Sequence, residues 1–248
     1  RYGRRQRQMC IRDRKKAFSS INFSIKEGEV VGIAGVEGNG QRELAESILG
    51  IHKIESGEII LGQENINDLN TRDRRESGIS FIPEDRQSQG LLMDVSLSEN
   101  VILGKQSSSK YKSRYSNIKF GEADKNSNTV IENFDVRTPG NETLALALSG
   151  GNQQKFVVGR EIENKPQLLI ASQPTRGIDI GAQSLIWNKL RLARDHGLGV
   201  LLISADLDEL IGLSDRLYVI YEGNLVKELD PENATPEILG SYMTGIKS

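Results

Sequence analysis

Cysteine, histidine and long apolar runs are scarce in this sequence, and each scarcity excludes a class of protein. The single cysteine, Cys10, excludes a disulfide framework and cannot form a metal site alone. The two histidines, His52 and His196, lie in polar, turn-forming stretches, so we expect neither to act in catalysis. No run of about 18 apolar residues occurs, and the sequence therefore predicts no segment that spans a bilayer.

What is present is an ordinary globular composition. The 248 residues are 37% hydrophobic and 27% charged, which suits one large α/β domain or a domain with an insert. The charge is uneven, because residues 1–16 hold eight basic side chains and one acidic side chain; a net charge of −2 for the chain leaves −9 for the rest. Since this basic head has no amphipathic period, we interpret residues 1–16 as non-native or unstructured. The alternative is an arm that binds nucleic acid or anionic lipid.

A glycine-rich stretch, Gly35–Arg42, follows an apolar strand pattern and precedes an amphipathic helix pattern. Its spacing matches G-x-x-x-x-G-K-[ST], in which backbone N–H groups surround phosphate oxygens, the lysine reaches the terminal phosphates and the hydroxyl holds Mg²⁺. Gln41 stands in the lysine position and Arg42 in the hydroxyl position. The stretch predicts the shape of a nucleotide site without its catalytic side chains; the alternative is an ordinary strand-to-helix turn. The predicted nucleotide-binding residues are Gly35, Glu37, Gly38, Asn39, Gly40, Gln41 and Arg42.

A second motif, Leu148–Gln154, reads Leu-Ser-Gly-Gly-Asn-Gln-Gln and precedes a helix predicted from near Gln153 to Glu161. Such a turn at a helix N-terminus is an anion site, because free N–H groups and the helix dipole point outward. A third segment, Pro166–Asp179, is an apolar strand followed by a turn. In this order, the three segments resemble the P-loop, the signature, and the Walker B strand with the D-loop of ATP-binding cassette (ABC) ATPases.

The alternation of strand and helix patterns, together with this resemblance, predicts an α/β fold of the ABC-type P-loop NTPases. We expect a mainly parallel sheet with an antiparallel β edge and an inserted helical subdomain. Strands are predicted within residues 17–35, where Ile21, Phe23 and Ile25 alternate, and at Glu58–Leu61 and Gly78–Ile82. A hairpin is predicted from Arg216–Ile220 and Asn224–Glu228, and a short last helix near Pro236–Tyr242.

Three further runs resemble a narrower group. They are Glu84-Asp85-Arg86 with Gly90-Leu91, the Asn-Gln-Gln-Lys run ending at Lys155, and the Pro-Thr-Arg-Gly run ending at Gly177. All are similar to the second, C-terminal cassette of double-cassette importers for simple sugars of the ribose and galactose type, or for nucleosides. The resemblance covers about residues 17–246. It implies a RecA-like nucleotide-binding core over 17–84 and 153–248, and a helical subdomain over 85–152 that ends in the signature.

Six positions that touch the γ-phosphate, Mg²⁺ or water in the family have changed here. Besides Gln41 and Arg42, the Walker B acids are Ser172 and Gln173, the switch histidine is Ala205 and the Q-loop glutamine is Glu84. Gln173 has no carboxylate that accepts a proton from water, and loss of a general base costs about 10²–10⁴ in rate. We therefore predict that this chain has no intact catalytic residue and that the fragment alone is inactive. Such extensive change resembles the nucleoside, basic membrane lipoprotein-associated branch.

The signature, in contrast, is retained. In the family, each ATP lies between the P-loop of one cassette and the signature of another, so the resemblance implies that this signature serves a partner's ATP and Mg²⁺. The residues that match it are Leu148, Ser149, Gly150, Gly151, Asn152 and Gln153, followed by Gly177 and Asp179 of the D-loop. No metal-binding residue of the chain's own is predicted.

The resulting functional hypothesis is a cassette that energises uptake of a simple sugar or a nucleoside. The resemblance implies four further expectations: an N-terminal cassette of the same polypeptide, permease subunits in the membrane, an indirect link to a solute-binding protein, and a place on the cytoplasmic face of the cell membrane. Nucleic acid is not an expected partner, because the body of the chain carries a net negative charge. The alternatives are a soluble ABC ATPase outside transport and a scaffold cassette that never contacts nucleotide.

Overall fold

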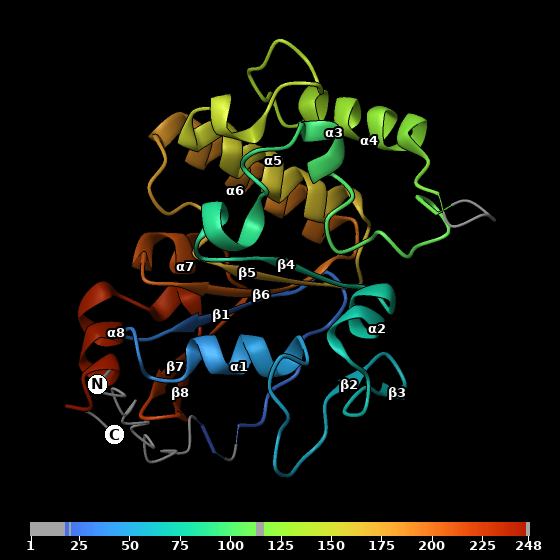
Figure 1. The fold of residues 1–248 in the computed structure, drawn as a ribbon. Coiled ribbons are helices and arrows are strands. Elements are labelled where there is room, and N and C mark those ends of the chain that lie inside the picture. The colour runs from blue at the N-terminus through green and yellow to red at the C-terminus, as the bar shows by residue number, and fades with distance from the viewer. Residues whose placement is uncertain (1–17, 20, 113–116, 247–248) are drawn as a thin grey trace, which may run out of the picture.

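A six-stranded sheet forms the centre of the computed structural model, which describes residues 18–19, 21–112 and 117–246 (Figure 1). The strand order is β4-β5-β6-β1-β7-β8; neighbours from β4 to β7 run parallel, and β8 is antiparallel to β7. The predicted mainly parallel sheet with an antiparallel edge is confirmed, and the basic head at 1–16 lies outside the described residues. The strands are β1 (Val30–Ala34), β4 (Ile79–Ile82), β5 (Leu168–Ser172), β6 (Gly199–Ser204), β7 (Arg216–Tyr221) and β8 (Asn224–Leu229).

The central strands are apolar runs because both faces of the sheet are covered. Successive side chains of a strand point to opposite faces. In β1, Val30 and Ala34 belong to one buried cluster, while Val31 and Ile33 belong to another on the opposite face. Sheets buried on both faces favour continuous β-branched and apolar residues. This explains why the sequence of these strands shows no polar alternation.

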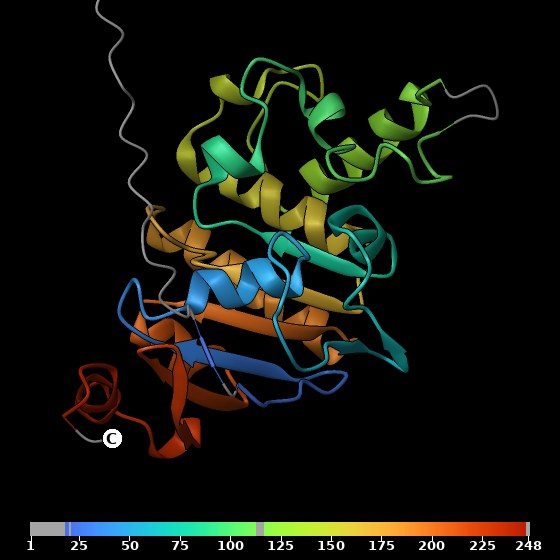
Figure 2. The same cartoon turned by 60° about the horizontal axis from the view of Figure 1, so that its bottom comes forward.

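Helices cover both faces. The first cluster takes in α5 (Gly150–Glu163), α6 (Ile180–Asp195) and α7 (Leu207–Leu213), and the second takes in α1 (Gln41–Ile48). On the far side of α5 from the sheet lie α3 (Leu97–Asn100) and α4 (Phe120–Asn133), which form the helical layer seen in Figures 1 and 2. The remaining helices are α2 (Thr71–Glu76) and α8 (Pro236–Met243), with short helical turns at Arg86–Gly90, Ala145–Ala147 and Pro231–Asn233.

Helix α5 crosses the boundary predicted at 152/153. It begins at Gly150, immediately after Ser149, and packs on β4 on one side and on α4 on the other. The predicted start near Gln153 was late because the glycines of the signature already belong to the helix. One helix therefore belongs to both layers.

The strand predicted around Ile21–Ile25 is absent, although the side chains alternate as expected. Ile21, Phe23 and Ile25 pack against the second cluster, but the described backbone around them forms no sheet ladder. The strand predicted at 58–61 shortens to β2 (Ile60–Leu61), which pairs only with β3 (Glu64–Asn65). An alternation of apolar residues indicates that one face of the segment is buried, but a β-strand also needs a neighbouring strand within about 5 Å.

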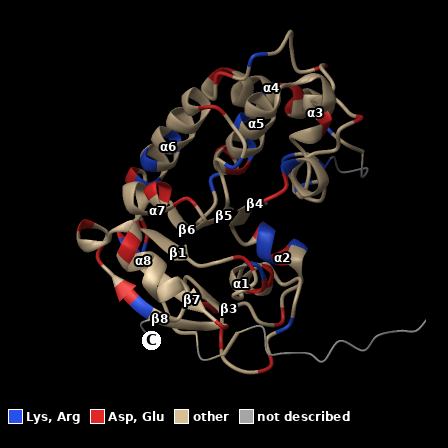
Figure 3. Ribbon diagram, turned by 90° about the vertical axis from the view of Figure 1, so that its left-hand side faces the viewer, with Lys and Arg blue, Asp and Glu red and all other residues tan. Residues whose placement is uncertain are grey.

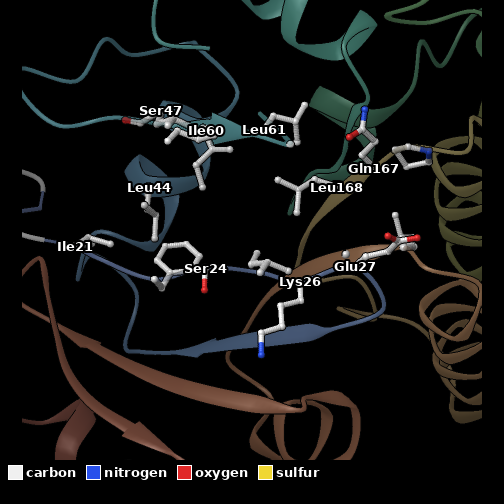
Figure 4. A pocket seen from close by; sticks show the side chains of 18 of the residues that line it. Ile21, Ser24, Lys26, Glu27, Leu44, Ser47, Ile60, Leu61, Gln167 and Leu168 are labelled. Atoms are coloured by element: carbon white, nitrogen blue, oxygen red, sulfur yellow. The ribbon is translucent and has the colours of Figure 1, made fainter. Parts of the chain in front are cut away.

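A hollow separates these two segments, as Figure 4 shows. Its wall combines apolar side chains such as Leu44 and Leu168 with polar ones such as Lys26 and Gln167. Residues 21–27 lie on one side of this hollow and β2 on the other, so the two do not pair. None of the site residues predicted from the sequence lies on its wall.

Charged residues of both signs occur together on the helices, including α1 and α2 (Figure 3). One group is buried. Glu161 of α5 accepts hydrogen bonds from Arg160 Nε and Arg75 Nη2, both at 2.9 Å. Arg160 also donates to the carbonyls of Gly90 and Asn100, at 2.8 and 3.2 Å. This ion cluster therefore joins α5, α2 and the start of the helical layer.

Candidate functional site

A cleft opens at the carboxyl ends of the parallel strands, between α1 and the turn after β4. Ligands of open parallel sheets bind at this edge, because the loops that leave successive strands meet there. Glu37 and Arg42 come from the loop and helix after β1, Glu84 from the end of β4, and Ser172 and Arg176 from the end of β5. With Gly177, the structure therefore brings five of the predicted site residues to one cleft.

The glycine-rich loop makes the left-handed turns that its sequence allows. Gly38 and Gly40 have φ angles of 92° and 107°, a region that glycine adopts without strain. Gly40 is the N-cap of α1 and supplies no side-chain cap, so the N–H groups of the first turn are available to an anion. Asn39 ties the loop to the β7–β8 hairpin, since its carbonyl accepts from Gly223 N at 2.9 Å and its Oδ1 from Glu222 N at 3.1 Å.

Gln41 turns back into the loop. Its Nε2 donates to the carbonyl of Val36 at 3.0 Å, and the side chain is buried. A Cβ built on Gly35 would lie 2.3 Å from the same Nε2, so the glycine leaves the space that the amide fills. The residue in the lysine position thus braces the loop from inside.

Arg42 pairs along its own helix. Its Nε lies 2.7 Å from Oε1 of Glu46, one turn on, and its side chain is 69% exposed. The hydrogen bond that Arg42 donates to Glu46 raises the pKa of Arg42, as does the negative charge of Glu46. The guanidinium is therefore charged and already partnered at the mouth of the cleft.

The ends of β4, β5 and β6 are joined by side chains at the predicted positions. Ser172 is buried at the end of β5. Gln173 has a φ of 51°, and its Oε1 accepts the N–H of Ala205 at 3.1 Å. Glu84 forms an ion pair with Arg176. Of the predicted positions on these strand ends, only Glu84 carries a carboxylate.

The signature turn is built around Ser149. Ser149 Oγ caps α5, accepting Asn152 Nδ2 at 3.0 Å and, more weakly, Asn152 N at 3.5 Å. Ser149 is exposed, and Gly150 and Gly151 are half-buried. Gln153 points inward: it is 3% exposed and its Nε2 donates to the carbonyls of Ala145 and Leu148 at 3.2 Å. Leu148 is buried as well. The outward part of the signature is therefore Ser149–Gly151, and Gln153 shapes the turn from within.

The turn that resembles the D-loop lies against the signature. Gly177 has a φ of 68°, and Asp179 caps α6 by accepting the N–H of Ala182 at 2.9 Å. This hydrogen bond lowers the pKa of Asp179. A Cβ built on Gly151 would lie 3.1 Å from Asp179 Oδ2, so the two motifs touch and form one surface.

Arg86 and Arg176 also line the cleft, although their sequence motifs predict no role for either side chain. Arg86 Nη1 donates to the carbonyl of Arg176 at 3.1 Å, and a Cβ on Gly150 would lie 2.6 Å from Arg86 Nη2. Arg86 thus connects the turn after β4 to the signature and to the turn after β5. The signal that could have found these arginines is their place, since each follows the carboxyl end of a parallel strand.

The described ranges contain no helix that is long and apolar enough to cross a membrane. They also contain no group of three or more His, Cys, Asp or Glu side chains placed to hold a metal ion.

Similar proteins come from two groups of transport ATPases. The chain is 47% identical over 228 residues to the guanosine import ATP-binding protein NupO of Bacillus subtilis, covering 91% of this chain and 44% of that protein. It is 40% identical to the nucleoside import ATP-binding protein NupA of Lactococcus lactis, with the same coverage. It is 37% identical to the ribose import ATP-binding protein RbsA of Oceanobacillus iheyensis, covering 94% of this chain and 46% of that protein. The chain thus spans less than half the length of these relatives.

Solved structures agree on the fold. A nucleotide-free ATP-binding cassette from an ABC transporter superposes with a TM-score of 0.77 at 22% identity, covering 93% of this chain and 94% of that one. A dimeric cassette bound to ADP and Pi superposes with a TM-score of 0.73 at 24% identity, covering 87% and 90%. The family model described as ABC transporter matches residues 18–176, well over half of the chain. The chain therefore belongs to the ABC transporter family and has the fold of its ATP-binding cassette.

Proposed function

We propose that this chain is an ATP-binding cassette of an importer for nucleosides or simple sugars, and that it serves the ATP of a partner cassette rather than hydrolysing its own. The observation that carries the proposal is a contrast between the two motifs. Ser149–Gly151 forms an open helix N-terminus beside Asp179, whereas Gln41 is folded into its own loop. Next to Asp179, the apolar side chain of Ile180 is 81% exposed, which suits a surface that another protein covers.

The relatives support the transport role. All three are named as import ATP-binding proteins, two for nucleosides and one for ribose. Because each is about twice as long as this chain, the proposal includes an N-terminal cassette in the same polypeptide, which makes this chain the second cassette. It further includes permease subunits that meet the helical subdomain of residues 85–152, an indirect link to a solute-binding protein, and a position on the cytoplasmic face of the membrane. The core would then be residues 17–84 and 153–248.

The chain's own loop suits a phosphate better than it suits Mg²⁺. The uncapped first turn of α1 and the left-handed glycines are fit for phosphate oxygens. Mg²⁺ favours oxygen ligands such as carboxylates, but Arg42 brings a cation, Glu84 is paired with Arg176, and Gln173 is engaged with Ala205. The hydroxyl of Ser172 alone is a poor replacement. We therefore place both ATP hydrolysis and Mg²⁺ at the partner's P-loop, completed by Ser149–Gly151.

Substitutions in the two motifs test this assignment in the full-length subunit assembled with its permease. Ser149→Arg and Gly151→Asp should abolish substrate uptake and ATPase activity. Both side chains block the helix N-terminus, and an aspartate at 151 also meets the carboxylate of Asp179. Gln41→Ala and Gln173→Ala should do far less, because these positions hold no catalytic group.

Gly240→Asp is the matched control for Gly151→Asp, because a Cβ at Gly240 meets nothing within 4 Å and Gly240 lies in α8, outside the helical subdomain. It should leave uptake unchanged, and thermal unfolding should show that all variants fold. Equal damage from the P-loop and signature substitutions would contradict the proposal, since it would mean that the chain's own loop works as a catalytic site.

A further inference from the structure

A buried carboxyl group that the proposed function does not use lies behind the signature and the D-loop. Glu209, in α7, is 1% exposed. Its Oε1 accepts the hydroxyl of Thr175 at 2.7 Å and the indole N–H of Trp187 at 2.9 Å. The contact joins three elements: α7, the turn after β5, and α6.

The surroundings of Glu209 favour its neutral form. Burial raises the pKa of Glu209, and the hydrogen bond from Thr175 offsets this only in part. The second carboxyl oxygen, Oε2, is buried without a hydrogen bond of ordinary geometry in the described part of the chain, although the nearby hydroxyl of Ser204 also lowers the pKa of Glu209. A buried carboxyl with one unpaired oxygen costs stability, and what this one contributes in return is the contact with Thr175 and Trp187.

The partner of Glu209 lies in a turn that is held from several sides. The turn spans residues 173–177 and has left-handed residues at both ends, Gln173 with a φ of 51° and Gly177 with 68°. From the signature helix, Gln154 Nε2 donates to the carbonyl of Pro174 at 2.7 Å. From α7, Glu209 accepts from Thr175. A non-glycine residue such as Gln173 is strained in this region, and it persists only where the surroundings fix it.

We infer that Glu209 is a positioning residue for the composite ATP site: through Thr175 it fixes the turn of residues 173–177 against the signature helix. Gln154 holds the same turn to the signature helix, so the signature and the D-loop keep one relative position. Neither Glu209 nor Thr175 need touch nucleotide for this. The inference rests on the proposed function, because the relative position of the signature and the D-loop matters only if Ser149–Gly151 and Asp179 face a partner's ATP together.

Four variants of the full-length subunit, assembled with its permease, test the inference. Thr175→Val keeps the side-chain volume and removes the hydroxyl, and Glu209→Leu removes the acceptor. Both should lower kcat for ATP about tenfold or more, because small displacements of positioning groups carry such losses, and leave KM within about twofold. Glu209→Gln keeps an acceptor for Thr175 and should restore kcat. Asp208→Asn is the control, because Asp208 is exposed on the same helix.

Trp187 supplies a readout that does not depend on turnover. It is the only tryptophan of the chain, and its indole donates to the same oxygen as Thr175. Thr175→Val should therefore shift the emission of Trp187 in the isolated chain, whereas Asp208→Asn should not. A Glu209→Leu chain that fails to fold leaves Thr175→Val to decide.

The outcomes separate the two ideas. If Ser149→Arg leaves the transporter active, the proposed function is wrong and this inference falls with it. If Ser149→Arg inactivates but Thr175→Val keeps wild-type kcat and Trp187 emission, only the inference is overturned. A kcat that falls equally in Glu209→Leu and Glu209→Gln, with Thr175→Val unaffected, would also overturn it, because the carboxyl would then act through fold stability alone.

Discussion

Replacing Glu161 by glutamine should be among the most damaging conservative changes in this chain. Glu161 is fully buried between the guanidinium groups of Arg160 and Arg75, and also receives the N–H of Phe81 at 3.4 Å. Glutamine has nearly the same shape and still accepts one hydrogen bond. The substitution removes the negative charge that pairs with Arg160. The other hydrogen-bond partners of Arg160 among the described residues are backbone carbonyls, and Arg160 is itself only 3% exposed.

The expected loss follows from that uncompensated charge. Breaking a buried pair by removing one partner costs about 3–5 kcal/mol, out of a total free energy of unfolding of about 5–15 kcal/mol. For a domain of this size each kcal/mol lowers Tm by about 2–4 °C, so Glu161→Gln should lower Tm by roughly 6–20 °C. Urea denaturation at pH 7, followed by circular dichroism, measures the loss directly.

The pH dependence has a definite sign. Burial alone raises the pKa of Glu161, but the charges of Arg160 and Arg75 outweigh it and hold this pKa below the ordinary value of 4.5. A lowered carboxyl pKa contributes stability that is present above pH 4.5 and is lost as the pH falls through the folded-state pKa. The difference in free energy of unfolding between the wild-type chain and Glu161→Gln should therefore be constant near neutral pH and become smaller in acid.

Exposed Glu132, on α4, is the control. Glu132→Gln should change the free energy of unfolding by no more than about 0.5 kcal/mol. A loss below about 1 kcal/mol for Glu161→Gln at pH 7, or a gap that widens in acid, would refute the argument from the buried charges.

Three other outcomes are expected. Gly159→Ala should destabilise the chain by about 1–2 kcal/mol in urea, because its Cβ would lie 2.7 Å from Phe134 and overpacking outweighs the helix propensity gained; a stabilised variant would contradict this. Any ATP binding by the isolated chain should be weak and nearly independent of Mg²⁺, because Arg42 holds a fixed positive charge near the metal position; titration with and without Mg²⁺ checks this, and a strong Mg²⁺ requirement would refute it. Since burial raises the pKa of Glu209, the wild-type chain should lose stability as the pH rises through that pKa, and Glu209→Gln should remove this dependence in thermal melts.

Much of the fold could be predicted because the central strands carry strong local signals. Runs such as Leu168–Ser172 and Gly199–Ser204 are apolar on both faces, which only a doubly covered sheet requires. The segment around Phe23 could not be predicted in the same way. Its alternation states which side is buried but not whether another strand lies alongside, and that depends on residues distant in sequence.

The location of the site could be predicted, but the direction of its side chains could not. Gly38 and Gly40 predict left-handed turns, and Ser149 predicts a helix cap. That Gln153 faces inward depends on the carbonyls of Ala145 and Leu148, in and just after the short helical turn before it. That Arg86 reaches Gly150 depends on the approach of two segments more than sixty residues apart.

The place of β1 in the sheet has a consequence for how the chain is made. Val30 pairs with Val200, and Val31 pairs with Arg216, so neither ladder of β1 can form until about 170 residues more have been synthesised. At roughly 5–20 residues per second this takes on the order of 10–35 s, during which an apolar strand has no neighbour and a ribosome still holds the chain. Even then the glycine-rich loop is unfinished, because Asn39 meets its hydrogen-bond donors only when Glu222 and Gly223 emerge. The glycine-rich loop is thus completed only after the β7–β8 hairpin has been synthesised.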